Sequence, residues 1–237
     1  MAPRIAIVAY QGVLADESYA FRDVFRRVPQ AEVVTVGERI GVVAGPGGSQ
    51  VVTATFRDIA RVDVVAVPGG LGSHHHPDIG WWIMAAEPTW IVSSSTGSAL
   101  LAAAGLLRGR TAASHWLAAS LLERHGATMS RQRLVVDAPY ITCSGRATTT
   151  EAALAVVGRL GGAELVATVE AALATSPGAE EPACDAPSRY RPWRGRPAPV
   201  RPTARPTPPA AGAPPESAWA ARPTPGVSGV EIELEER

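Results

Sequence analysis

The chain has 237 residues, of which 46% are hydrophobic, and its 22 Lys and Arg balance its 22 Asp and Glu. A net charge of zero gives no electrostatic case for nucleic-acid binding. No stretch reaches the roughly 18 apolar residues of a membrane span, and the N-terminal run lacks a signal-peptide cleavage site. Two cysteines, Cys143 and Cys184, lie in dissimilar parts of the chain and fit a reducing compartment. We therefore expect a cytoplasmic protein with no membrane partner.

Composition divides the chain near residue 175. Residues 175–237 hold fourteen of the 21 prolines and are otherwise dominated by Ala, Arg and Gly. Such a segment cannot bury enough apolar surface to fold. The sequence predicts one globular domain over 1–174 and a Pro/Ala/Arg-rich disordered tail over 175–237. In that tail, the Arg-rich run at 189–205 favours a solvated linker over a contact with an anionic partner. Apolar and acidic residues alternate at 230–235, and this segment could add a strand to a sheet edge.

Strand and helix patterns alternate along residues 1–174. Short apolar runs predict strands at 4–10, 31–37, 62–67, 89–94, 110–114, 133–137 and 140–143. Helical patterns predict helices at 18–27, with Ser18 as the cap, and at 77–86, 96–107, 115–125, 148–160 and 163–174. A Gly-Pro-Gly-Gly sequence within 39–56 predicts a hairpin at the edge of the sheet. This order predicts an α/β fold with a mainly parallel sheet covered on both faces, and no helix-turn-helix pair for DNA binding follows it.

Residues 93–97, Ser-Ser-Ser-Thr-Gly, join a predicted strand to a predicted helix, and we call this segment the elbow. Ser95 lies at its turn, above the end of the sheet and beside the unpaired N–H groups of the helix. The segment differs by one residue from the G-x-S-x-G elbow of hydrolases, a geometry that suits a nucleophile. A serine that caps the helix is the competing explanation. Gly69 and Gly70 follow the preceding strand and fall at the same edge of the sheet, where ligands bind.

The elbow and its surroundings resemble one known family. The stretch from Ser93 to Trp116 and the sequence Val67-Pro-Gly-Gly resemble the PfpI/ThiJ superfamily of class I glutamine amidotransferase-like domains, in the branch that contains isocyanide hydratase. The resemblance covers about residues 4–174 and implies a single flavodoxin-like sandwich and a homodimer. It also implies that Glu17 occupies the acidic position beside the nucleophile and that His115 lies near the elbow.

The family normally carries Cys at the elbow, where this chain has Ser95. A hydroxyl has a far higher pKa than a thiol and needs a base, for which His115 and Glu17 are the candidates. With His115 as base, Ser95 would perform hydrolytic chemistry, and the N–H groups of Gly70 and Thr96 would stabilise an oxyanion. Alternatively, a buried Glu17 with a raised pKa moves a proton while Ser95 only binds the reacting group, which gives a hydratase, lyase or cyclase.

Further candidates surround these residues. His74, in the sequence His-His-His, is expected to contact substrate together with Gly69 and Trp116, whose indole would line an apolar pocket. We expect no metal site and no cofactor, because adjacent histidines cannot easily turn three rings onto one ion. Two hypotheses follow: an isocyanide hydratase-like enzyme acting on a small molecule, or a noncatalytic metabolite-binding or regulatory relative that has lost the elbow Cys.

Overall fold

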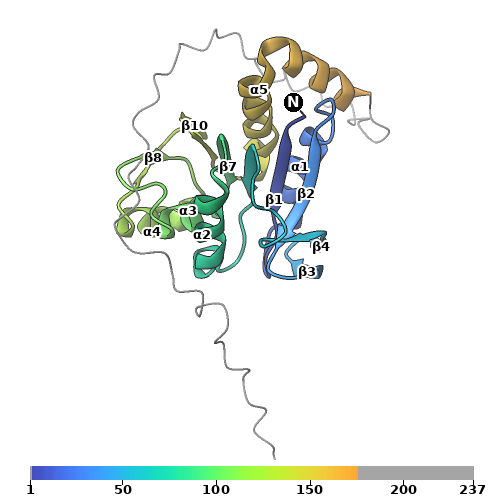
Figure 1. The fold of residues 1–237 in the computed structure, drawn as a ribbon. Helices are drawn as coiled ribbons and strands as arrows, with labels where there is room; N and C mark the ends of the chain where they lie inside the picture. The colour runs from blue at the N-terminus through green and yellow to red at the C-terminus, as the bar shows by residue number, and fades with distance from the viewer. Residues whose placement is uncertain (1, 176–237) are drawn as a thin grey trace, which may run out of the picture. The chain divides into compact units, whose positions relative to one another are not determined.

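A seven-stranded sheet forms the centre of the computed structural model (Figure 1). The structure describes residues 2–175, and the predictions for residues 176–237 lie outside that range. In spatial order the strands of the sheet are β10 (Leu134–Asp137), β11 (Tyr140–Cys143), β7 (Trp90–Ser94), β6 (Val64–Val67), β1 (Arg4–Val8), β2 (Glu32–Gly37) and β5 (Ala54–Thr55). Every neighbouring pair is parallel except β10 with β11. The predicted α/β fold with a mainly parallel sheet is confirmed.

Helices cover both faces of this sheet. They are α1 (Ala15–Phe25), α2 (Pro77–Ala86), α3 (Gly97–Ala103), α4 (Ala119–Arg124) and α5 (Arg146–Ala174), with single 3₁₀ turns η1 (Ser73–His75) and η2 (Trp116–Ala118). Successive strand residues point to opposite faces. Ile5 and Ile7 accordingly join the apolar cluster under α1 and α5, whereas Ala6 and Val8 join the cluster under α2 and α3.

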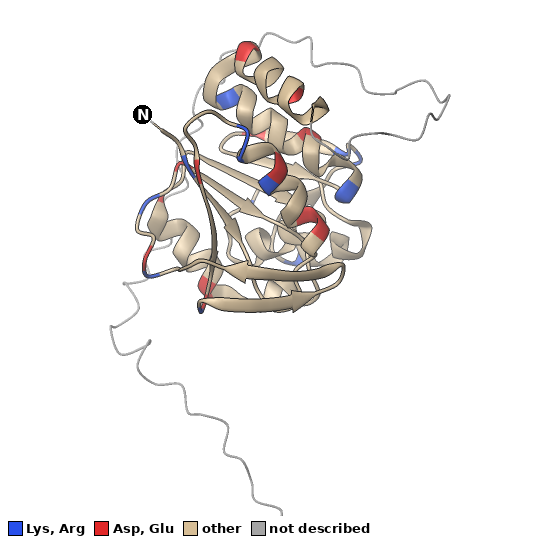
Figure 2. Ribbon diagram, turned by 90° about the vertical axis from the view of Figure 1, so that its right-hand side faces the viewer, with Lys and Arg blue, Asp and Glu red and all other residues tan. Residues whose placement is uncertain are grey.

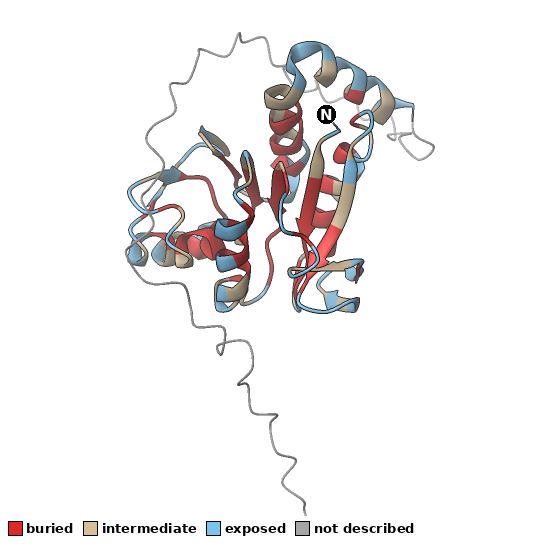
Figure 3. Ribbon diagram, in the orientation of Figure 1, coloured by how far each residue is buried: buried red, intermediate tan, exposed pale blue. Residues whose placement is uncertain are grey.

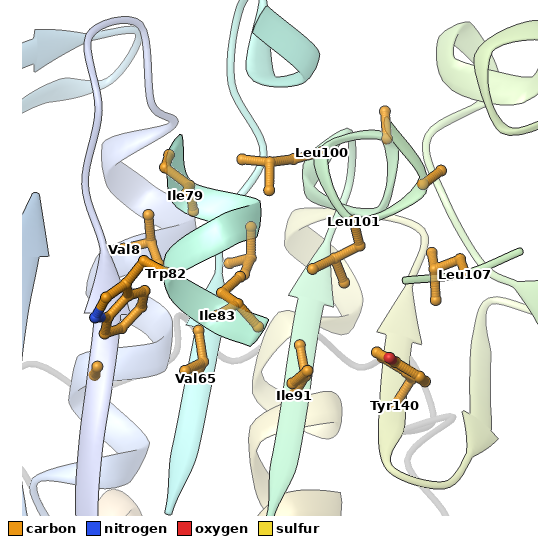
Figure 4. Close-up of a cluster of buried hydrophobic side chains, with 14 of the residues drawn as sticks. Val8, Val65, Ile79, Trp82, Ile83, Ile91, Leu100, Leu101, Leu107 and Tyr140 are labelled. Carbon is orange, nitrogen blue, oxygen red and sulfur yellow. The ribbon is translucent and has the colours of Figure 1, made fainter. Parts of the chain in front are cut away.

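The two apolar clusters sandwich the sheet and make it the most buried part of the domain (Figure 3). In the cluster under α2 and α3, Trp82 and Leu101 lie over the strands that carry Val65 and Ile91 (Figure 4). The Trp82 indole nitrogen donates to the carbonyl of Ile59, so its one polar atom is satisfied inside the core. These contacts fix the strand ends at which the elbow lies.

The start of α1 differs from its prediction. The helix begins at Ala15, and Ser18 is buried within it with no hydrogen-bond partner for its hydroxyl, so the assignment of Ser18 as the cap is wrong. The backbone N–H of Ala15 donates instead to the carbonyl of Pro46, at 3.1 Å. A tertiary contact from the hairpin therefore replaces the local cap, which a single helix pattern does not reveal.

Two predicted β elements lie outside the main sheet. The hairpin of β3 (Gly41–Gly45) and β4 (Gly48–Val52) forms its own antiparallel sheet, and β5 takes the edge position beside β2. The strand predicted at 110–114 is the short β8 (Thr111–Ala112), which pairs only with β9 (Thr128–Met129). The helix predicted at 115–125 is divided into η2 and α4.

The last helix, α5, contains a kink at Gly161 and Gly162, where the sequence predicted a break. By length and composition it is the one helix in residues 2–175 that could cross a membrane, and 33% of its most apolar window is buried. Its first half packs on the sheet through Val156 and Val157, as the core helix of a globular domain does.

Charged residues of both signs lie on the helices, as the blue and red segments of the ribbon show (Figure 2). One ion pair joins the first turns of two helices, since Asp16 Oδ2 of α1 lies 3.1 Å from Arg146 Nη1 of α5. A surface pair of this kind stabilises the fold only slightly. It does, however, fix the carboxylate next to Glu17 in position.

Candidate active site

The elbow forms a sharp turn between β7 and α3. Ser95 has a φ of 52°, in the left-handed region that few side chains adopt, and is only 4% exposed. Its N–H donates to the carbonyl of Cys143 at 3.0 Å, and its carbonyl accepts from Ser114 Oγ at 2.8 Å. The cap of α3 is Thr96, without a side-chain bond, so helix capping does not explain Ser95. The surrounding bonds hold a turn that would otherwise be unfavourable.

The loop after β6 approaches the elbow backbone to backbone. A Cβ atom on Gly69 would lie 2.7 Å from the Cβ of Ser95 and 3.0 Å from the N of Thr96. A Cβ on Gly97 would lie 2.3 Å from the carbonyl oxygen of Val67. Only glycine allows these approaches, so the strand ends of β6 and β7 form one compact unit.

Glu17 lies behind this unit, and its side chain is nearly inaccessible, with 2% of the residue exposed. Its Oε2 accepts hydrogen bonds from the Gly69 N–H at 2.8 Å and from Ser94 Oγ at 2.5 Å. Burial raises the pKa of Glu17 above its usual range, against the opposing effect of the Ser94 and Gly69 bonds. The structure thus brings the Glu17 carboxyl to the elbow.

The glycine N–H groups next to the elbow are bonded in this structure. That of Gly69 donates to Glu17, and that of Gly70 donates to Thr96 Oγ1 at 2.9 Å. Thr96 Oγ1 also donates to the carbonyl of Gly70 at 2.9 Å. The Gly70 N–H can therefore bind an oxyanion only if the Thr96 side chain turns away, and its oxyanion role stays a prediction.

His115 reaches the elbow through its backbone. Its N–H lies 3.4 Å from the carbonyl oxygen of Ser95, and its Nδ1 accepts from the Leu117 N–H at 3.3 Å. A neutral imidazole with an accepting Nδ1 carries its proton on Nε2, so that nitrogen can donate but cannot accept. Within residues 2–175, no hydrogen bond joins the imidazole to Ser95 Oγ. The base role of His115 requires a different ring position.

His74 and Trp116 lie on the two segments that flank the elbow. Ser73 Oγ donates to the carbonyl of Thr96 at 2.8 Å and thereby holds η1, which contains His74, against α3. Burial and the neighbouring cations lower the pKa of His74. Trp116 is 71% exposed, so it lines no enclosed pocket formed by residues 2–175. Among residues 2–175, no three side chains of His, Cys, Asp or Glu are grouped so that they could hold a metal ion.

The sequence of this chain is similar to those of known proteins. The profile of the DJ-1/PfpI family matches residues 3–159. This chain belongs to the DJ-1/PfpI family. It is 32% identical to an isonitrile hydratase of Pseudomonas putida over 161 residues, which cover 65% of this chain and 71% of that protein.

Solved structures of the same family share the fold. A ThiJ/PfpI family protein from Pseudomonas syringae superposes with a TM-score of 0.69 at 26% identity, over 79% of this chain and 80% of the other. Drosophila melanogaster DJ-1beta gives a TM-score of 0.66 at 23% identity, over 75% of this chain and all of that one, and so bears on the fold alone. The resemblance to the superfamily and the flavodoxin-like fold are confirmed.

Two residues at the DJ-1/PfpI site were missed in the sequence. Ser94 is the last residue of β7 and binds Glu17, while the hydroxyl of Tyr10 donates to the carbonyl of Pro68 at 2.9 Å beneath the glycine loop. Burial, with Glu17 nearby, raises the pKa of Tyr10. Ser94 ends β7 and Tyr10 lies two residues beyond the end of β1, so both are at the carboxyl edge of the sheet, and that position was the available signal. Cys143 is a buried core residue as predicted, and burial raises its pKa to about 11.

A separate cleft of about 320 Å³ lies along α1. Four residues of that helix and its C-cap line it, namely Tyr19, Ala20, Arg22, Asp23 and Arg26. None of the predicted site residues is among them. The candidate active site therefore rests on the contacts around Ser95 and not on this cleft.

Proposed function

We propose that this chain is a hydratase for small molecules in which Glu17 transfers the proton, with isocyanides as the first substrate class to test. The observation that carries the proposal is the buried Glu17 carboxyl beside the Ser95 turn, with a pKa raised by burial. General acids at work near neutral pH are commonly carboxyls raised in this way. The 32% identity to an isonitrile hydratase supports the substrate class.

The proposed reaction needs only a proton donor, a water molecule and a place for the substrate carbon. Neutral Glu17 donates its proton to the isocyanide carbon, and the oxygen of water bonds to the same carbon as the water proton passes to the Glu17 carboxylate. The resulting imidic acid shifts one proton from oxygen to nitrogen and becomes an N-substituted formamide. The carboxyl ends the cycle neutral, so atoms and protons balance. Ser95 Oγ acts as a hydrogen-bond partner of the water or the substrate.

Two contacts favour this role of Ser95 over that of a nucleophile. The Nδ1 of His115 accepts from Leu117, and no base among the described residues is bonded to Ser95 Oγ. The Gly70 N–H, one of the expected oxyanion donors, is bonded to Thr96. Nucleophilic attack by a hydroxyl requires both a base and an oxyanion site, and both would have to form on substrate binding.

The test compares wild type, Glu17→Gln and Ser95→Ala on a panel of small isocyanides, amides, esters and α-oxoaldehydes. Loss of a general acid or base typically lowers turnover by about 10²- to 10⁴-fold, which we expect for Glu17→Gln, whereas Ser95→Ala should lower it by roughly tenfold or less. Asp16→Asn is the matched control, because it removes the adjacent carboxylate but not Glu17. Full activity of Glu17→Gln, or abolished activity of Ser95→Ala alone, would contradict the mechanism.

A noncatalytic metabolite-binding role is the second candidate. The observation that favours it is the bonded state of the Gly69 and Gly70 N–H groups, which leaves neither donor ready for a reacting oxyanion. In that case no compound of the panel would turn over, but one would raise the unfolding temperature. A homodimer and a cytoplasmic location remain predictions, and sedimentation of the full chain tests the first.

A further inference from the structure

We infer that Ser94 is the positioning residue for Glu17, because its hydroxyl and the Gly69 N–H together hold Oε2 as an acceptor and keep the transferable proton on Oε1. The inference rests on the proposed acid–base role of Glu17 and adds the residue that orients its proton. Ser94 contacts no reacting atom in this scheme. It acts only through the carboxyl of Glu17.

The geometry around Oε2 carries the inference. Ser94 is fully buried, and its Oγ lies 2.5 Å from Oε2, while the N of Gly69 lies 2.8 Å from the same oxygen. No donor within residues 2–175 is bonded to Oε1 of Glu17. An oxygen that already accepts two hydrogen bonds is the poorer site for a proton. The neutral carboxyl therefore carries its proton on Oε1, the oxygen left for substrate or water.

The sequence neighbour Ser93 provides an internal comparison. It is equally buried, but because side chains alternate along β7 its hydroxyl lies on the other face, 3.1 Å from Ser98 Oγ. Ser93 makes no contact with Glu17. The two serines thus differ in their partner while sharing strand, burial and chemistry.

Other ionisable groups also face Glu17 from the elements around it. They are Tyr10 in the loop after β1, Asp16 on the same helix, His115 in the segment before η2, and Cys143 on β11. Asp16 raises the pKa of Glu17 and His115 lowers it, both less than burial and the two hydrogen bonds do. We therefore expect the loss of the Ser94 hydrogen bond to change the pKa of Glu17 more than these neighbouring charges do.

The experiment measures the pKa of Glu17 directly, by ¹³C NMR of the labelled carboxyl in the full chain. Ser94→Ala deletes a donor that favours the charged form, so it should raise the pKa of Glu17. It should also move the alkaline limb of the kcat profile, along which neutral Glu17 loses its proton, to higher pH, and lower kcat roughly 10- to 100-fold at similar KM, as a misplaced reacting group does. Ser93→Ala should leave the pKa unchanged, and Ser94→Thr, which keeps the hydroxyl, should restore it.

An unchanged pKa in a folded Ser94→Ala protein would overturn the inference, as would equal shifts in the Ser93→Ala and Ser94→Ala variants. The thermal unfolding of each variant is recorded to establish that it folds, and Ser94→Thr serves if the alanine variant does not. The NMR titration tests whether Ser94 acts on Glu17 even if the protein converts none of the compounds on the panel. In that case the proposed reaction alone has failed.

Discussion

Glu17 and His115 lie on two sides of Ser95, and Glu17 is held in place more firmly than His115 is. On one side, Glu17 is buried and bonded to Ser94 and to the Gly69 N–H within 2.8 Å. On the other side, His115 is half-buried, accepts a long bond of 3.3 Å from Leu117, and precedes the exposed Trp116. A reacting group must be held within a fraction of an ångström to be effective. The comparison therefore supports the proposed role of Glu17 over that of His115.

The same difference bears on how a serine at the elbow can take part in the chemistry. A thiolate can be stabilised by the helix N-terminus alone, whereas a serine hydroxyl depends on a neighbouring base. The His115 side does not supply that base in this structure, because Nδ1 of His115 is turned to Leu117. A carboxyl that transfers protons by itself needs no activated nucleophile, so the site remains chemically consistent with Ser95 present.

The largest effect on this comparison is expected from Gly69→Ala. The added Cβ would lie 2.7 Å from the Cβ of Ser95 and 3.1 Å from Oε2 of Glu17, so the loop or the carboxyl must move. Overpacking of this kind costs about 1–3 kcal/mol of folding free energy. Because Glu17 is displaced, the turnover of the Gly69→Ala variant should fall roughly 100-fold or more.

Urea denaturation and turnover of this variant are compared with those of Gly158→Ala. Gly158 lies inside α5, and a Cβ there would approach only Val166 Cγ2, at 3.4 Å. Alanine in a helix interior is favoured over glycine by up to about 1 kcal/mol, so this control should be neutral or stabilised. Wild-type turnover in folded Gly69→Ala would refute the close packing of loop and carboxyl.

A smaller effect is expected in the pH dependence of stability. Because the folded-state pKa of Glu17 is raised, the folded protein retains this proton more strongly than the unfolded chain does. The contribution to the unfolding free energy is fully present below the unfolded pKa and is lost as pH rises through the folded pKa. Glu17→Gln keeps a neutral side chain at all pH values and escapes this loss.

Urea denaturation of wild type and Glu17→Gln from about pH 4 to about pH 8 measures the difference. The stability of the variant relative to wild type should rise with pH over this range. If the unfolding free energies of the two proteins changed in parallel with pH, the pKa of Glu17 would not be raised in the folded state. The site would then lack its proposed proton donor.

The sequence predicted the sheet and most of its helices because strand and helix patterns alternate with short loops. It did not predict the start of α1, since the carbonyl that satisfies Ala15 comes from Pro46 in a hairpin thirty-one residues away. It also assigned residues 110–114 to a main-sheet strand, whereas β8 pairs only with β9. Local patterns carry no information about which distant backbone group completes a helix end or pairs with a short strand.

The candidate site was predictable in part. The glycine loop and Ser95 followed from their positions after two strands, but Glu17 was supported only by the family resemblance, since Asp16-Glu17 alone reads as a solvated start of a helix. Ser94 was not assigned a role, because the three consecutive serines differ only in the direction in which the backbone turns each side chain. Alternation along β7 turns Ser93 and Ser94 to opposite faces, and the φ of 52° takes Ser95 out of that alternation in the folded elbow.

The smallest effect is expected from a substitution of His115, on the more exposed side of Ser95. His115→Gln should change kcat/KM by less than about threefold, because the imidazole is bonded to Leu117 and to no reacting group. If His115 were the base that activates Ser95, the same change would lower turnover by about 10²-fold or more. His125→Gln, at the end of α4, is the matched control for loss of a nearby imidazole. A large loss in His115→Gln with normal turnover in His125→Gln would reverse the comparison and assign the chemistry to the histidine side.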